Sequence, residues 1–64
     1  MEHRVSENLA EYIFNDLPYY QLFRCAEGSI WWIKISDTQA VAVNEGFTTD
    51  FIADTKVIKI WYSN

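Results

Sequence analysis

Two segments rich in aromatic and β-branched residues constrain the fold of this chain more than any other feature. They are residues 29–36 (SIWWIKIS) and 56–63 (KVIKIWYS), and their composition is typical of β-strands. If these two strands pair, side-chain alternation places four residues on one face of the sheet: Trp32, Lys34, Lys59 and Trp61. An exposed patch of two indoles and two ammonium groups would mark a contact surface. These four residues are therefore the predicted partner-binding site.

The alternate residues of the strands form the predicted core. Eight side chains fall on this second face, where they would pack against a helix: Trp31, Ile33, Ile35, Val41, Val43, Ile58, Ile60 and Tyr62. A one-residue slip in strand pairing, or a bulge after Trp31 and Trp32, would exchange the two faces. The sequence alone therefore leaves open which face is exposed.

The N-terminal segment has the spacing of an amphipathic helix. Apolar residues recur at steps of three and four: Val5, Leu9, Tyr12, Ile13 and Leu17. Ser6 is placed to cap the first turn, and Pro18 would stop the helix. The spacing predicts a helix over about 6–17. Three acids on it form a predicted secondary acidic surface: Glu7, Glu11 and Asp16.

After Pro18 the pattern changes to strands. We expect four of them, at residues 19–26, 29–36, 39–43 and 56–62, with a tight turn at Glu27 and Gly28 between the first two. Residues 47–55 are interpreted as a loop with one helical turn at most, although helix, strand and loop all remain open there. A helix followed by hairpin-linked strands predicts an α+β fold. In it, residues 1–64 form a single domain whose N-terminal α-helix packs on a four-stranded antiparallel β-meander.

The chain has enough apolar sequence to fold. Half of its 64 residues are hydrophobic and 17% are aromatic, which is far from the composition of a disordered segment. A domain of this size still buries only roughly 60% of the surface of its unfolded chain, and such domains often depend on disulfides, metals or oligomerisation. Cys25 is the single cysteine, so no disulfide can form within the chain. Of these additional sources of stability, the sequence leaves oligomerisation, and a homodimer is therefore a prediction.

No catalytic or metal-binding motif is recognisable in the sequence. His3 is the one histidine, and we interpret Cys25 as a packing residue; together they supply neither a catalytic triad nor the four ligands of a structural zinc site. Asp50 and Asp54 lack the glycine and the alternating ligands of a calcium loop. The two glycines do not belong to a phosphate-binding loop. We therefore expect no enzyme activity, no cofactor and no metal.

Charge and hydropathy restrict the remaining function classes. Nine acidic residues against five basic ones give a net charge of −4, which disfavours general duplex binding. No apolar run approaches the ~18 residues of a membrane span, and the N-terminus lacks the order of a signal peptide, so we expect a soluble cytoplasmic protein, in the host cell if it is viral. The predicted function is noncatalytic. The chain would bind a larger intracellular protein and inhibit or modulate it, as compact virus-encoded accessory proteins do, with Trp32 and Trp61 as anchors.

Three alternatives remain open from the sequence. In the first, bases of a single-stranded nucleic acid stack on Trp32 and Trp61 while three lysines contact phosphates: Lys34, Lys56 and Lys59. In the second, the secondary acidic surface and acids in the predicted turns imitate the phosphates of a nucleic acid and occupy a nucleic-acid-binding protein. The turn acids are Glu27, Asp37, Glu45 and Asp50. In the third, the contacts between indoles and ammonium groups only stabilise the sheet.

Overall fold

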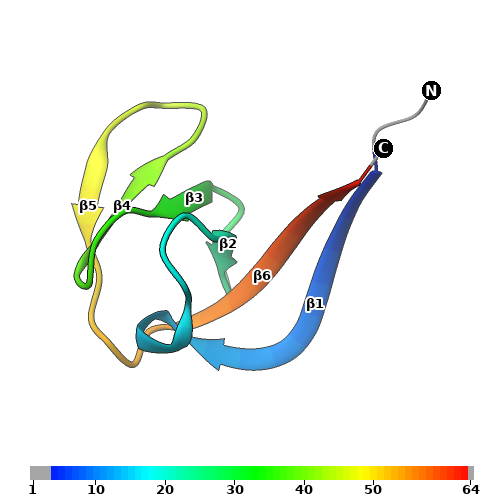
Figure 1. Cartoon of the computed structure of the whole chain (residues 1–64), viewed down its shortest axis with the longest axis horizontal. Helices are drawn as coiled ribbons and strands as arrows, with labels where there is room; N and C mark the ends of the chain where they lie inside the picture. The colour runs from blue at the N-terminus through cyan, green and yellow to red at the C-terminus, as the bar shows by residue number, and fades with distance from the viewer. Residues whose placement is uncertain (1–3, 64) are drawn as a thin grey trace.

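The chain folds as a single antiparallel β-sheet. A computed structural model describes the backbone of residues 4–63 and the side chains of residues 10–61. The elements are β1 (Arg4–Ile13), the 3₁₀ turn η1 (Phe14–Asp16), β2 (Leu22–Cys25), β3 (Trp31–Lys34), β4 (Gln39–Ala42), β5 (Thr48–Asp50) and β6 (Lys56–Ser63). The spatial order of the strands is β1-β6-β2-β3-β4-β5 (Figure 1). Within the described residues, no helix is long and apolar enough to cross a membrane.

The predicted α+β fold is wrong, because the N-terminal segment is a strand. Arg4–Ile13 pairs with β6, from Arg4 opposite Ser63 to Ile13 opposite Lys56, and the two strands run side by side away from the rest of the sheet (Figure 1). A helix of about 12 residues is marginal by itself in water, whereas β6 offers backbone partners to both ends of the segment, Arg4–Asn8 and Tyr12–Ile13. A register shift between Asn8 and Tyr12 interrupts the alternation of β1. The segment therefore lacks the period of two that would have identified it as a strand.

The prediction of an antiparallel sheet is confirmed, although its connectivity differs. Strands β2, β3 and β4 lie within the segments expected to be strands, and β5 occupies part of the segment interpreted as a loop. After the meander β2–β5, the chain returns so that β6 pairs with β2. The expected direct pairing of residues 29–36 with residues 56–63 is therefore wrong, because β2 separates the two strands.

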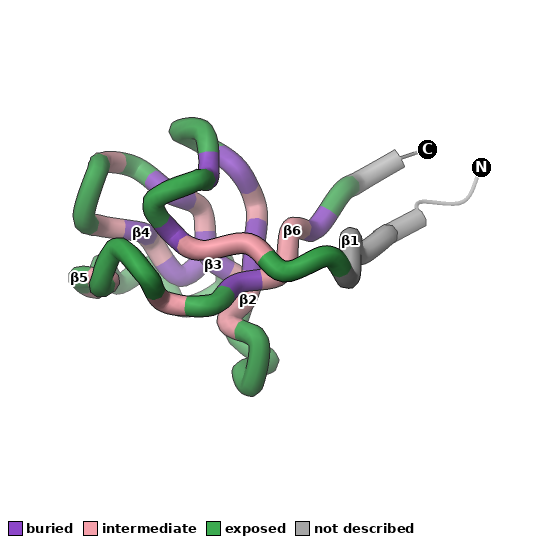
Figure 2. The backbone as a smooth tube through the Cα atoms, turned by 90° about the horizontal axis from the view of Figure 1, so that it is seen from below, coloured by how far each residue is buried: buried purple, intermediate pink, exposed green. Residues whose placement is uncertain are grey.

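The core lies on one side of the sheet, which we call the inner face. Its buried strand residues are Phe23 of β2, Trp32 and Lys34 of β3, Ala40 and Ala42 of β4, and Val57 of β6. Phe14 and Leu17 cover this face from η1 and the residue that follows it, together with the ring of Phe51. Two backbone hydrogen bonds fix the cover, from the Phe14 N–H to the Thr55 carbonyl and from the Asn15 N–H to the Ala53 carbonyl, both 2.9 Å long. In Figure 2 the buried positions alternate with half-buried ones along the central strands.

The side of the sheet that was predicted to be the core is the more exposed one. We call it the outer face; it consists of the half-buried side chains of Leu22, Trp31, Ile33, Val41 and Ile58. Of the other predicted core residues, Ile35 and Val43 are exposed, and the side chain of Tyr62 lies outside the described residues. Ile60 lies on the same side of β6 as Ile58 and is buried there. The physical reason is the missing helix. The cover of the core comes from η1 and Phe51 instead, and these pack on the inner face.

Candidate protein-binding surfaces

The predicted Trp–Lys site follows the expected alternation but lies largely in the interior. Trp32 is opposite Phe23, and Phe23 is opposite Lys59, so these side chains share one side of the sheet. Lys34 and Trp61 are two residues further along their strands and fall on the same side. This side is the inner face, where Trp32 is 7% exposed and Lys34 is 3% exposed. The structure thus brings the four residues to one face without bringing all four to the surface.

Trp32 belongs to an aromatic cluster inside the protein. Its ring meets the Phe51 ring edge-on at 5.0 Å and the Phe47 ring edge-on at 5.6 Å. Phe51 also stacks on Phe14 at 5.0 Å and meets Phe23 edge-on at 5.5 Å. Such offset and edge-to-face pairs are favourable arrangements of ring quadrupoles. The indole of Trp32 therefore stabilises the core and is not accessible to a partner.

Lys34 fixes the cover of the core to the sheet. Its Nζ donates hydrogen bonds to the Leu17 carbonyl at 2.8 Å and to the Phe14 carbonyl at 3.0 Å. The same ammonium lies 4.7 Å from the centroid of the Phe14 ring and 5.8 Å from that of the Tyr19 ring. Carbonyls at the end of a helical turn and aromatic ring faces both favour a cation. The buried Lys34 side chain therefore stabilises the fold, and its ammonium group is not accessible to a phosphate or a carboxylate of a partner.

The accessible half of the predicted site is a small cluster around Lys59. The Lys59 Nζ lies 4.3 Å from the centroid of the Tyr12 ring and 5.9 Å from that of the Trp61 ring. Trp61 is 47% exposed. Tyr12, which the sequence assigned to a helix, reaches this cluster from β1. One ammonium between two aromatic side chains can contribute to a contact surface, but it is smaller than the patch that the sequence predicted.

The secondary acidic surface loses the geometry that defined it. Glu7 and Glu11 belong to β1 rather than to a helix, and the side chain of Glu7 lies outside the described residues. Glu11 Oε1 is 3.5 Å from the Nζ of Lys56, and both side chains are largely exposed. Asp16 is exposed in η1. An exposed ion pair of this kind contributes little to stability, and it partly neutralises the surface that a nucleic-acid mimic would need.

A second surface, not anticipated from the sequence, is formed by the adjacent tyrosines 19 and 20, which we call the tyrosine pair. They are the central residues of a turn closed by a 3.3 Å hydrogen bond from the Gln21 N–H to the Pro18 carbonyl. Tyr20 has a φ of 69°, in the left-handed region that normally requires glycine or asparagine at the third position of a turn. Its side chain is 75% exposed and that of Tyr19 is 54% exposed. Both rings therefore project from the protein.

The neighbours of Tyr19 hold it in one orientation. Its hydroxyl donates a 2.5 Å hydrogen bond to Oδ1 of Asp37 in the turn between β3 and β4. This hydrogen bond, and then the negative charge of Asp37, raise the pKa of Tyr19 above its ordinary value of 10.0. The Tyr20 ring packs on the Tyr19 ring with centroids 6.4 Å apart and planes inclined by 66°. Tyr19 is thus an exposed ring that is already ordered by its surroundings.

The sequence held only a weak signal for the tyrosine pair. Residues 19–26 read as one continuous strand because tyrosine favours strands, and β2 begins at Leu22. Pro18 indicated the end of an element and is a common turn residue. Nothing in the residue types indicated that Tyr20 would adopt a positive φ, since a bulky aromatic residue is among the least expected there.

The possible metal ligands of the described residues do not form a metal site. No three His, Cys, Asp or Glu side chains among them lie close enough together to hold a metal ion. Cys25 is half-buried, and desolvation by burial raises the pKa of its thiol, which reduces the reactive thiolate fraction. His3 lies outside the described residues. Comparisons with protein-family models, with curated proteins and with solved structures gave no match.

Proposed function

We propose that this chain is a noncatalytic protein-binding module that contacts a larger intracellular protein through the tyrosine pair and so inhibits or modulates it. The proposal keeps the class of function expected from the sequence. It replaces the expected anchors, Trp32 and Trp61, by Tyr19 and Tyr20. Tyrosine is enriched among the residues that carry most of the binding energy in protein interfaces. Its ring offers a large apolar area, and its hydroxyl forms a hydrogen bond at the margin.

The backbone conformation of Tyr20 is the observation that carries this proposal. A non-glycine residue in the left-handed region costs about 1–2 kcal/mol, and a side chain that is 75% exposed recovers little of this through burial. Strained backbone conformations are concentrated at functional sites. The Tyr20 N–H donates a 2.6 Å hydrogen bond to the Lys34 carbonyl, so the fold uses the Tyr20 backbone but not its exposed ring. The energetic benefit of the Tyr20 ring is therefore expected outside the isolated chain, in contact with a partner.

The restricted conformation of the Tyr19 side chain supports the same proposal. The hydrogen bond to Asp37 and the contact with the Tyr20 ring restrict the side chain before any partner arrives. Immobilising a flexible side chain costs about 0.5–1.5 kcal/mol on binding, and a preordered side chain avoids most of this cost. Lys59 and Trp61 remain candidate contacts of the same kind, since Trp61 is 47% exposed.

The critical experiment compares Tyr20→Gly with the wild type. Glycine relieves the backbone strain but adds freedom to the unfolded chain, so the free energy of unfolding should stay within about 1 kcal/mol of the wild-type value. Capture of proteins from a nuclease-treated lysate, quantified by mass spectrometry, should lose a partner that the wild type retains. Ile52→Ala is the matched control, because Ile52 is 74% exposed and outside the pair.

Two results would contradict the proposal. One is a captured partner that remains equally bound by Tyr20→Gly and by Tyr19→Ala, since neither ring would then anchor it. The other is a loss of more than about 2 kcal/mol of stability in Tyr20→Gly, which would make the ring a structural element. A signal that disappears with nuclease treatment would instead favour the nucleic-acid alternative, for which Lys59 and Trp61 are the accessible residues of the original four.

A further inference from the structure

The outer face carries more apolar side chains than one solvent-facing side of a sheet needs. Leu22 is directly opposite Ile33, and Ile33 is directly opposite Val41, so an aliphatic row crosses β2, β3 and β4. The next row places Arg24 between Ile58 and Trp31. Beyond the strand ends, Ile35 and Val43 are 38% and 43% exposed. The face is therefore a continuous surface of partly exposed hydrophobic residues.

Antiparallel strands with one side in water normally alternate between apolar and polar residues. Here the alternation is absent, because β3 and β4 carry apolar residues on both sides: Trp32, Ala40 and Ala42 on the inner face, and Trp31, Ile33 and Val41 on the outer face. The one lysine of β3 points inward. A sheet of this composition is typical of one covered on both faces. Among the described residues, η1 and Phe51 cover the inner face. On the outer side Ile60 of β6 is buried, whereas the residues of β2, β3 and β4 stay partly exposed.

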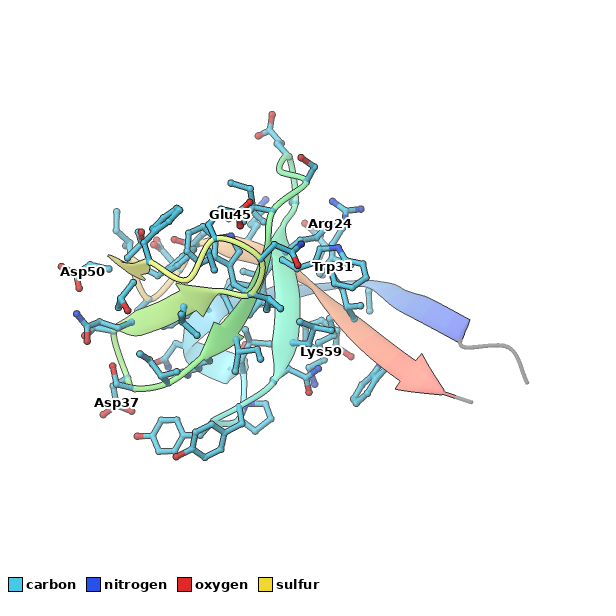
Figure 3. The ribbon with its side chains drawn as sticks, turned by 90° about the horizontal axis from the view of Figure 1, so that it is seen from above. Arg24, Trp31, Asp37, Glu45, Asp50 and Lys59 are labelled. Atoms are coloured by element: carbon cyan, nitrogen blue, oxygen red, sulfur yellow. The ribbon has the colours of Figure 1, made fainter. Side chains whose placement is uncertain are left out.

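The charges at the margin of the outer face are complementary to each other. Arg24 lies two residues along β2 from Leu22, and Asp50 lies opposite Gln39, which is two residues along β4 from Val41. Alternation places both on the outer side, at opposite corners of the aliphatic row. Figure 3 shows Arg24 beside Trp31 at one side of the sheet and Asp50 at the far side. The surface thus has a positive corner and a negative corner separated by a hydrophobic centre.

We propose that the outer face binds the outer face of a second copy of this chain. A twofold axis that lies between the two sheets, and crosses the diagonal from Arg24 to Asp50 near Ile33 and Val41, brings each positive corner against the partner's negative corner. Such an interface is isologous and closed, as in most homodimers. The same two residues therefore form two equivalent ion pairs, and Ile33 packs near its own symmetry mate.

The geometry of this arrangement matches a known mode of sheet packing. Arg24 and Asp50 are three strand positions apart, about 14 Å at the usual spacing between strands, and four residues apart along the strand direction, also about 14 Å. The diagonal therefore runs at about 45° to the strands, and the twofold axis makes the strands of the two copies cross at about 90°. Orthogonal crossing is one of the two common ways in which sheets pack face to face.

The hydrogen bonds of the corner residues are compatible with this contact. Arg24 Nη1 donates to the carbonyls of Cys25, Ala26 and Gly28, at 3.2–3.3 Å, which holds the guanidinium over the turn after β2. Asp50 Oδ1 accepts a 3.0 Å hydrogen bond from Gln39 Nε2. The guanidinium and the carboxylate keep their charges while they make these contacts, and Arg24 makes others as well, so the attraction between the two corners does not require that either group be without a partner.

The test is the oligomeric state of the full chain, measured by sedimentation velocity at increasing concentration. Because each copy would contribute one face of a small sheet, we expect a weak dimer with a dissociation constant in the micromolar range. Ile33→Glu places two carboxylates near the twofold axis and should raise this constant at least about 100-fold. Circular dichroism and the unfolding transition establish that the variant is folded.

A charge exchange keeps the test independent of the hydrophobic centre. Asp50→Lys places like charges together at both corners and should weaken the dimer about tenfold, and adding Arg24→Glu should restore most of the affinity. Asp54→Lys is the control with the same change in net charge, and it should leave the dissociation constant unchanged.

A wild type that is monomeric at every concentration would overturn the proposal and leave the face to a different protein. Equal effects of Asp50→Lys and Asp54→Lys, without rescue, would also overturn it. Tyr19 and Tyr20 take no part in these variants, so the outcome is independent of the proposed function.

Discussion

Replacing the buried Lys34 by methionine removes an ammonium group from the interior while keeping most of the side-chain volume. The lost contacts are the hydrogen bonds to the Leu17 carbonyl at 2.8 Å and the Phe14 carbonyl at 3.0 Å, and the position 4.7 Å from the Phe14 ring. The Phe14 carbonyl also accepts from the Leu17 N–H at 3.1 Å, so it stays paired after the substitution. The variant therefore loses both charge-assisted bonds but leaves one carbonyl, that of Leu17, without its donor.

The size of the effect follows from these contacts. Hydrogen bonds that involve a charged group contribute about 1.5–3 kcal/mol each, and a cation over a ring contributes about 1 kcal/mol. Against this sum stands the desolvation of the buried ammonium, a cost of several kcal/mol that disappears with the charge. We expect a net loss of about 2–3 kcal/mol of the free energy of unfolding. A domain of 64 residues has a total of about 3–10 kcal/mol, so the loss is large.

Urea unfolding followed by tryptophan fluorescence measures this loss directly. With a slope near 1 kcal/mol/M for a small domain, the midpoint should fall by about 2–3 M. Lys59→Met is the matched control, because the ammonium of Lys59 has its ring contacts with Tyr12 and Trp61 at a half-buried position. It should cost less than about 1 kcal/mol. Equal losses in the two variants, or an unchanged midpoint in Lys34→Met, would refute the structural role assigned to Lys34.

Three further predictions concern the core, a hydroxyl and a thiol. Phe51→Ala should cost about 2–4 kcal/mol, because its ring contacts three other rings of the core cluster; a loss below about 1 kcal/mol in urea unfolding would contradict the packing described. In an alkaline titration followed by tyrosinate absorbance, Tyr19 should ionise above its ordinary pKa of 10.0, and Asp37→Asn should lower its midpoint. Since the hydrogen bond requires the protonated hydroxyl, its stabilising effect is complete below pH 10.0 and is lost as the pH rises through the raised pKa. The pKa of the Cys25 thiol is raised by burial, so alkylation near pH 8 should be slower in the folded chain than in urea, and equal rates would show that the thiol is not protected.

The strands and the parity of their side chains were accessible from the sequence. Trp32 and Lys34 fall on one face and Ile33 falls on the other, because successive side chains of a strand point to opposite sides whatever surrounds it. The aromatic and β-branched segments located β3 and β6 for the same local reason. Local patterns are sufficient wherever the backbone geometry alone determines the outcome.

The N-terminal segment shows where local patterns fail. The spacing of its apolar residues is typical of an amphipathic helix. However, backbone pairing of Arg4–Ile13 with β6 stabilises the segment more than a short isolated helix would. The register shift between Asn8 and Tyr12 also removed the alternation that a strand would show. The partner of this segment lies about 50 residues later in the chain, outside any local window of sequence.

The accessible part of the candidate site also depended on distant contacts. The four residues of the predicted site were correctly placed on one face, yet η1 and Phe51 bury Trp32 and Lys34 on that face. The tyrosine pair came to the surface because the turn between Pro18 and Gln21 imposes a positive φ on Tyr20. Pro18 is a common turn residue, but no residue type at these positions indicates a positive φ at Tyr20.

The sequence by itself determined that the chain has an antiparallel sheet, and that Trp32 and Lys34 share a face opposite to Ile33. Both follow from the two-residue repeat of a strand, which each segment carries independently of the others. Only the tertiary structure decided that the N-terminal segment is a strand, which face is covered, and which aromatic rings remain exposed. These outcomes depend on free-energy differences of a few kcal/mol between alternative partners of the same segment, and the partners are brought together only when the whole chain folds.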